Sequence, residues 1–166
     1  MGSKLCLLSL CVVLTSLPMQ AHIKGTITEK SVCGAAAVHQ TVVINDDRQH
    51  SVSLDQRLCR SDVPIEIGSL TSTEYVAYGV DDVQEGQSVD RGYVVGTMKN
   101  GDRYFLKYQG SATMKGNAPD HLEGTWTFTG GSGHLKELRG GGTYTAKPTT
   151  NGVGMEFVIQ GVYELP

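Results

Sequence analysis

The side chains of this sequence that are best suited to recognising a ligand are large aromatic residues in strand-like stretches. They are Tyr75, Tyr93, Tyr104, Tyr108 and Trp126. Their rings offer apolar faces, and their hydroxyl or indole groups can form hydrogen bonds that orient a bound molecule. These residues are therefore candidates for the lining of a ligand pocket, and the commoner role for such side chains is ordinary packing in the core or at a subunit interface.

One acidic residue, Glu123, is the candidate for proton transfer. It lies three positions before Trp126 in an alternating stretch, so in a strand the two side chains point to opposite faces. A Glu123 that faced the interior would have its pKa raised by burial and would suit general acid or base catalysis. The alternative, which is the commoner one for such a residue, places Glu123 on the solvated outer wall among threonines.

No other group of residues carries a specific catalytic or metal-binding signature. The five histidines are dispersed, without a pair at i and i+4: His22, His39, His50, His121 and His134. Ser132 lacks the G-x-S-x-G context of a hydrolase nucleophile. The glycine clusters around it do not spell a phosphate-binding loop. We predict no metal site and no cofactor.

The first 21 residues have the pattern of a secretory signal peptide. Lys4 supplies the positive start, Leu5 to Leu17 form an apolar run, and Ala21 is a small residue at the expected cleavage point. The run is too short to cross a bilayer, so no membrane span is expected. The prediction is a protein that is secreted or periplasmic, with a single domain over residues 22–166.

Two cysteines remain after this leader, Cys33 and Cys59. In an exported protein an even pair favours a disulfide. The alternative is two free thiols or half of a metal site, but neither cysteine belongs to a C-x-x-C motif. Closing a loop of this length would stabilise the fold by roughly 3 to 3.5 kcal/mol on the chain-entropy model.

The charge balance argues against nucleic acid as a partner. Without the leader, 13 basic side chains face 17 acidic ones, a formal charge of −4. Lys and Arg are scattered singly, so the basic surface that phosphate binding needs is missing. The acidic residues at 81–82 and 85–90 are interpreted as a solvated loop, because they lack the spacing of a calcium loop.

The second half of the sequence reads as a series of strands with one apolar face. Asn100-Gly101 separates two strand-like stretches, 92–99 and 102–114, and is typical of a hairpin with a two-residue type I′ turn. Alternation places two sets of residues on the apolar faces: Tyr93, Val95 and Thr97 in the first stretch, and Tyr104, Leu106 and Tyr108 in the second. Residues 46–62 fit either a strand or a brief helix.

The most strongly patterned stretch is 122–147. An alternating strand leads into Gly130, Gly131 and Gly133, which are predicted to let the backbone turn where side chains would clash. Leu135 and Leu138 are spaced so that one helical turn would direct both into the core. Further strands follow up to Tyr163, and no long helical pattern is present. We predict an all-β protein, either a closed antiparallel barrel of about eight strands or a sandwich, and the even succession of hairpins favours the barrel.

The sequence TFTGGSG, followed by a short apolar turn, a glycine and a strand, then MEFV and GVY, resembles the C-terminal part of the allene oxide cyclase and dirigent barrels. The longer stretches DRGYVVGTMKNGDRYFLKYQG and GTWTFTGGSG resemble even more closely exported bacterial members of that superfamily, which have no assigned activity. The resemblance covers roughly residues 64–164.

The resemblance implies an eight-stranded antiparallel barrel whose apolar cavity holds an unsaturated lipid or a phenolic radical and steers its cyclisation or coupling. It also implies a dimer or trimer. The acidic and asparagine-bearing motif of plant allene oxide cyclases has no match in residues 22–62, and the acidic pairs of dirigent proteins have no match either. No catalytic residue is therefore transferred.

Two functions follow from the sequence. The first is binding of an apolar small molecule in the barrel; an enzyme of this kind would be a cofactor-independent cyclase or isomerase. The second is a non-catalytic secreted or periplasmic module whose outer wall binds a protein partner.

Overall fold

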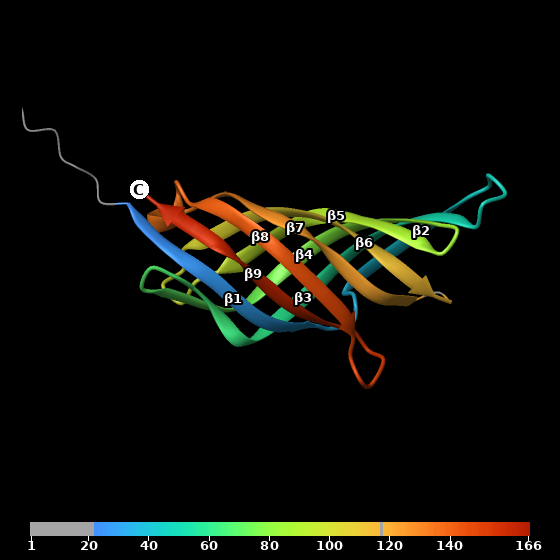
Figure 1. Cartoon of the computed structure of the whole chain (residues 1–166), viewed down its shortest axis with the longest axis horizontal. Helices are drawn as coiled ribbons and strands as arrows, with labels where there is room; N and C mark the ends of the chain where they lie inside the picture. Colours follow the sequence, from blue (N-terminus) through green and yellow to red (C-terminus); the bar gives the residue numbers. More distant parts are fainter. Residues whose placement is uncertain (1–21, 117) are drawn as a thin grey trace, which may run out of the picture.

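The computed structural model describes residues 22–116 and 118–166, and almost all of them lie in β-strands (Figure 1). The strands are β1 (Ile23–Cys33), β2 (Val38–Ile44), β3 (His50–Ile67), β4 (Leu70–Gln84), β5 (Gln87–Thr97), β6 (Arg103–Lys115), β7 (Ala118–Gly131), β8 (Arg139–Pro148) and β9 (Met155–Leu165). The predicted signal peptide, 1–21, lies outside the described residues.

Eight of these strands close into a barrel. Each strand from β3 to β8 pairs antiparallel with the next along the chain, and β1 pairs with both β9 and β3, which completes the ring. β2 stands outside the ring and pairs with β3 alone. The predicted all-β closed barrel is confirmed. Within the described ranges, no helix is long and apolar enough to cross a membrane.

β3 resolves the ambiguity of residues 46–62 in favour of a strand. Its first part, from His50 to Gln56, pairs with β2, and its later part pairs with β1. At the junction, Cys33 of β1 lies directly opposite Cys59 of β3, and the two form the predicted disulfide. Both sulfur-bearing side chains are buried, so the bond fixes the point where the barrel closes.

The hairpin between β5 and β6 is confirmed, but its predicted type I′ turn is wrong. The Gly101 N–H donates to the Met98 carbonyl, and only Gly101, with φ 90°, has a positive φ in this turn. This is the three-residue loop in which a type I turn precedes a left-handed glycine. The Asn100 side chain accepts a hydrogen bond from the Asp102 N–H at 3.0 Å, which holds Asn100 in the ordinary turn conformation.

The inner face of β5 also differs from the prediction. Tyr104, Leu106 and Tyr108 of β6 point inward as expected, but their partners across the strands are Gly96, Val94 and Gly92. The predicted inner residue Tyr93 is 64% exposed on the outer wall. Glycine has no apolar side chain, so in the sequence the inner face of β5 is less hydrophobic than its outer face.

These glycines are required by the aromatic rings that lie across them. A Cβ atom on Gly96 would stand 2.0 Å from Cζ of Tyr104, and one on Gly92 would stand 2.6 Å from the Tyr108 hydroxyl. On the other side of the barrel, a Cβ on Gly161 would meet the Trp126 ring at 2.5 Å. The Tyr104 and Tyr108 rings therefore each lie over a glycine of the neighbouring strand, whereas the Trp126 ring reaches past β8 to a glycine of β9, two strands away.

The glycine turn after β7 behaves largely as predicted. Gly130 and Gly133 have positive φ angles of 123° and 57°. Gly131 does not; it is needed because a Cβ there would stand 2.6 Å from the Leu135 carbonyl oxygen. A short 3-10 turn, Gly133–Leu135, follows, and both Leu135 and Leu138 are buried, which confirms that they close the core.

Replacing Gly96 with Ala tests whether the close packing of the Tyr104 ring requires a glycine at this position. The Tyr104 ring is almost fully buried and cannot move aside, so the variant should lose about 1 to 3 kcal/mol of unfolding free energy. Denaturant unfolding measures this. Gly34→Ala is the matched control, because nothing lies within 4 Å of its Cβ position. Equal stability of the two variants would contradict the fit.

Candidate functional site

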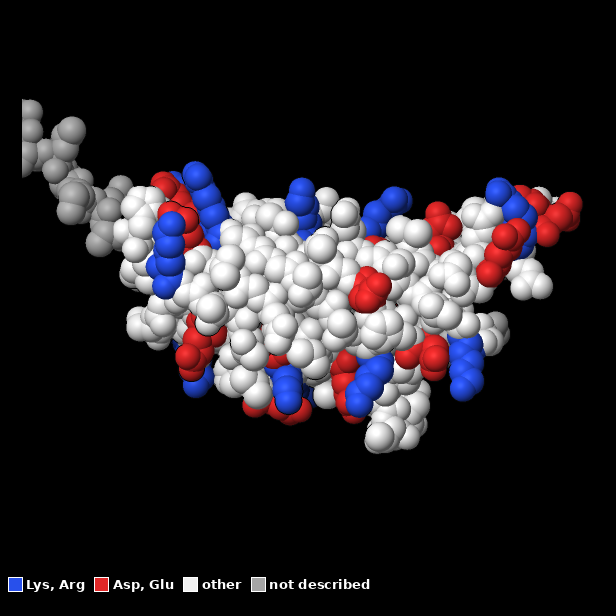
Figure 2. Space-filling view, in the orientation of Figure 1, with Lys and Arg blue, Asp and Glu red and all other residues white. Residues whose placement is uncertain are grey.

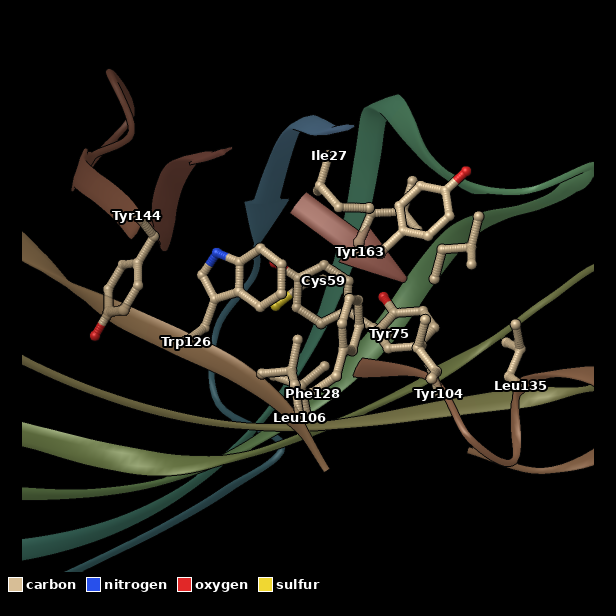
Figure 3. Packing of buried hydrophobic residues seen from close by; sticks show 14 of the residues in the cluster. Ile27, Cys59, Tyr75, Tyr104, Leu106, Trp126, Phe128, Leu135, Tyr144 and Tyr163 are labelled. Atoms are coloured by element: carbon tan, nitrogen blue, oxygen red, sulfur yellow. The ribbon is translucent and has the colours of Figure 1, made fainter. Parts of the chain in front are cut away.

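The barrel interior contains a cavity of about 150 Å³ that is partly open to solvent. Much of its lining is apolar and comes from opposite sides of the ring: Val94, Leu106, Leu122, Trp126, Phe157 and Ile159. A cavity of about this size is large enough to hold one aromatic ring. Figure 3 shows part of the surrounding core, where the rings of Tyr75, Tyr104, Trp126 and Phe128 gather inside the barrel.

Four of the five predicted aromatic residues line this cavity: Tyr75, Tyr104, Tyr108 and Trp126. The indole N–H of Trp126 donates to the Thr143 carbonyl at 3.2 Å, and the ring packs edge-on against Phe128 with centroids 4.9 Å apart. Tyr93 does not reach the cavity, because it points out of the barrel. The prediction for Tyr93 is wrong for the reason given above, the glycine-bearing inner face of β5.

Glu123 is not an interior acid. It occupies the strand face opposite Trp126, and since Trp126 points inward, the Glu123 side chain is 69% exposed, 3.7 Å from Nε2 of His121. Its assignment as a catalytic candidate is therefore corrected, and the outer-wall alternative holds.

Acidic residues do line the cavity, on strands where the sequence suggested a solvated loop. Asp81 of β4 and Asp90 of β5 are direct cross-strand partners, and both face inward. Asp90 is 7% exposed, and Asp81 is half-buried. Asp55 of β3 lines the same region of the cavity. The loop interpretation of residues 81–82 and 85–90 is wrong, because β4 and β5 extend through most of both stretches.

Burial and mutual repulsion keep a proton on the Asp81–Asp90 pair. Burial, followed by the negative charge of Asp55, raises the pKa of Asp81 to about 6. Burial, followed by the charge of Asp81, raises the pKa of Asp90 to about 7. Two carboxyls directly opposite each other in a poorly hydrated site do not both ionise readily. Near neutral pH the pair can therefore both donate and accept a proton.

Asp55 remains ionised beside this pair. Burial acts to raise the pKa of its carboxyl, but hydrogen bonds from His39 and Arg57 outweigh burial, and the pKa lies below its usual value. His39 Nδ1 lies 2.6 Å from Oδ1, and Arg57 Nη2 donates to Oδ2 at 3.0 Å. Asp55 thus supplies a fixed negative charge that helps to keep its neighbours protonated.

Tyr144 of β8 connects the acidic pair to the far wall. Its hydroxyl donates to Oδ2 of Asp90 at 3.2 Å. The ring reaches across Gly124 and Gly110, where a Cβ atom would stand within 2.6 Å of it. Burial raises the pKa of the Tyr144 hydroxyl, so the group stays protonated and acts as a donor.

A further buried carboxyl, Glu29 of β1, lines the cavity. It is 1% exposed; Oε1 accepts a hydrogen bond from the Ser61 hydroxyl, while Oε2 has no partner among the described residues. Burial raises its pKa to about 7. Nearby, the hydroxyls of Ser31 and Tyr75 lie 2.8 Å apart. Glu29 Oε2 is thus a buried polar atom at the cavity wall without a hydrogen-bond partner among the described residues.

The interior acids could have been recognised from strand phase. Asp81 shares its phase with Tyr75 and Ala77, and Glu29 shares its phase with Ile27 and Cys33, so each continues an apolar face. Acidic residues are seldom buried, so a carboxyl on the apolar face of a strand is a stronger candidate for a functional residue than a carboxyl in a solvated loop. In the described ranges, no group of three or more His, Cys, Asp or Glu residues has the geometry of a metal site.

Fold and site together define a closed antiparallel β-barrel with an acidic, aromatic internal cavity. No family model matches the sequence, and no curated protein matches it. Among solved structures, the pterocarpan synthase dirigent protein is similar, with a TM-score of 0.49 and 14% sequence identity over 95% of this chain and 98% of that chain. The likeness concerns the course of the chain, and no residue role is transferred from it.

The raised pKa of Asp90 should make stability depend on pH. The folded state holds this proton more tightly than the unfolded state, so the contribution of Asp90 to stability is fully present below its ordinary pKa of about 4 and is lost as pH rises through the folded pKa of about 7. Asp90→Asn should remove this part of the decline and gain about 2 kcal/mol relative to the parent between pH 5 and pH 8. Chemical unfolding at each pH measures the difference.

The control is Asp62→Asn, which changes an exposed carboxylate. It should follow the parent protein at every pH. A parent and an Asp90→Asn variant whose stabilities stay parallel from pH 5 to pH 8 would show that Asp90 titrates normally.

Proposed function

We propose that the barrel binds one aromatic or otherwise unsaturated small molecule bearing an oxygen substituent, and guides a cofactor-free cyclisation or isomerisation. The observation that carries the proposal is the composition of the cavity wall. Rings that accept an apolar skeleton, such as Trp126, line the same cavity as the proton-holding pair Asp81 and Asp90. Such a mixture of apolar wall and few convergent polar groups is typical of ligand sites.

The acidic pair suits ring closure by proton transfer. The ionised carboxylate of the pair takes the proton of a ligand hydroxyl, while the oxygen of that hydroxyl bonds to an electron-poor carbon of a conjugated double bond in the same ligand. The neutral member gives its proton to the other end of the conjugated system. The pair ends with as many protons as it began with, and the ligand is isomerised without any redox change. General acid–base catalysis of this kind is most effective when the pKa values lie near the working pH, as they do for Asp81 and Asp90.

Export belongs to the same proposal. The leader pattern at residues 1–21 and the Cys33–Cys59 disulfide both support a secreted or periplasmic location. A stable barrel that works outside the reducing cytoplasm would meet small molecules from the surroundings.

A second candidate function is binding of a protein partner by the outer wall. It is favoured by apolar side chains on the outer faces of β2 to β5, where Val42 is 62%, Leu54 47%, Val89 55% and Tyr93 64% exposed. Clustered exposed apolar residues of this kind often mark an interaction surface.

Binding of a simple phenol tests the proposed ligand class. The chain has a single tryptophan, Trp126, so its indole N–H gives one signal in a nitrogen-15 spectrum. Titration with p-cresol should shift this signal saturably. Toluene, which has the same skeleton without the hydroxyl, should bind about fivefold more weakly, because it cannot hydrogen-bond to the carboxyls.

Two variants show where the ligand binds. Ala77→Phe fills part of the cavity and should abolish the shift, whereas Tyr93→Phe changes only the outer wall and should leave it unchanged. A shift that survives Ala77→Phe, or no saturable shift with either compound, would contradict the proposed function.

A further inference from the structure

β2 is an open edge of the sheet. It hydrogen-bonds to β3 on one side, and no described strand pairs with its other side. All seven of its residues are exposed, and Val43 reaches 78%. In Figure 1 the tip of the β2–β3 hairpin projects beyond the rest of the barrel.

This edge lacks the features that normally prevent strand pairing between molecules. Exposed edges are usually protected by lysine and other charged residues, proline or bulges. β2 has the sequence VHQTVVI, with no Lys, Arg, Asp, Glu, Pro or Gly, and its pairing with β3 runs without a break from Val38 to Ile44. The turn 45–49, at the tip of the hairpin, carries the charged residues Asp46, Asp47 and Arg48 (Figure 2).

We propose that a second copy of this chain pairs with the free edge of β2, antiparallel to it, about a two-fold axis at Thr41. The inference does not depend on the cavity or its ligand. A two-fold arrangement uses the same strand from both copies, so a single self-complementary edge is sufficient. The result is one continuous sheet that runs from β3 and β2 of one copy into β2 and β3 of the other.

The sequence of β2 is complementary to itself in this register. Val38 of each copy lies opposite Ile44 of the other, and Gln40 lies opposite Val42. All four belong to the outer face of the strand, since His39 and Thr41 share the phase that pairs with the inward Asp55. The Val38–Ile44 pairs are apolar, and apolar cross-strand pairs stabilise antiparallel strands.

The outer surface next to the edge continues the apolar contact. Leu54 and Val52 of β3 are the partners of Gln40 and Val42, so each copy presents an apolar row that the other copy extends across the axis. The only titratable residue of β2, His39, is bound to Asp55 at 2.6 Å on the other face. No like charges therefore oppose each other within the paired strands.

The ends of the two strands are also compatible. In this register the acidic turn of one copy, with Asp46 and Asp47, lies beside residues 34–37 of the other, which are Gly-Ala-Ala-Ala. These are small and uncharged, so they neither repel nor obstruct the turn. Because a strand pair alone buries less than the roughly 1,200 Å² typical of stable interfaces, we expect a dimer with a Kd on the order of 10 µM.

Charge substitution at the axis tests the proposal. Thr41→Lys places two lysines directly opposite each other, and Thr41→Glu places two glutamates there. Analytical ultracentrifugation should show a dimer for the parent protein, a Kd raised at least about tenfold for each variant, and a restored dimer when the two variants are mixed. Thr127→Lys, on the exposed outer face of β7, should leave the dimer intact.

Cysteine cross-linking tests the register. Thr41→Cys should form an intermolecular disulfide on oxidation, because residues opposite each other in paired strands lie within disulfide range. Val43→Cys should not, because its counterpart lies about 13 Å away along the strand. A monomeric parent protein, separate variants that stay dimeric, a mixture that does not associate, or equal cross-linking at both positions would each overturn the proposal.

Discussion

The barrel depends on aromatic rings lying flat on glycine. Tyr104 and Tyr108 of β6 lie over Gly96 and Gly92 of β5, Trp126 lies over Gly161, and Tyr144 crosses Gly124 and Gly110. An interior of this size would otherwise fill with side chains that project to the centre. Because the large rings run along the wall, they form a packed core and still leave a cavity. The tyrosine rings also carry their hydroxyl groups from one strand to another.

The same arrangement determines the chemistry of the interior. Glycines on the inner wall leave room for the Tyr144 ring, so that its hydroxyl reaches Asp90. The packed rings also shield the nearby carboxyls from water. Burial raises the pKa values of Glu29 and Asp90 to about 7, whereas Asp55 stays ionised through His39 and Arg57. The cavity thus contains acids with different protonation states near neutral pH, and their differences arise from the partners that each strand supplies.

The sequence was sufficient to predict the architecture and much of the cavity wall. Alternation gave the strands and placed Trp126 inside, and the cysteine pair and Leu135 were interpreted correctly. The sequence did not predict the inward-facing residues correctly where those residues are glycines or acids. The inner face of β5 could not be recognised because glycines stand there in place of apolar residues. Asp81 and Asp90 could not be recognised because a run of acidic residues is typical of a solvent-exposed loop. The inner face of β5 and the Asp81–Asp90 pair both depend on which residues lie opposite each other in neighbouring strands, and the sequence of a single strand does not show this.

The central claim is that this cavity is a ligand site containing a proton-holding carboxyl pair. Carbon-13 NMR of the aspartate side chains, followed across pH with and without p-cresol, tests it most directly. The account predicts that the Asp90 carboxyl titrates near pH 7, and that bound p-cresol moves its signal and its pKa while exposed carboxyls stay unchanged. Titration of every aspartate near its ordinary value of about 4, with no response to p-cresol, would contradict it.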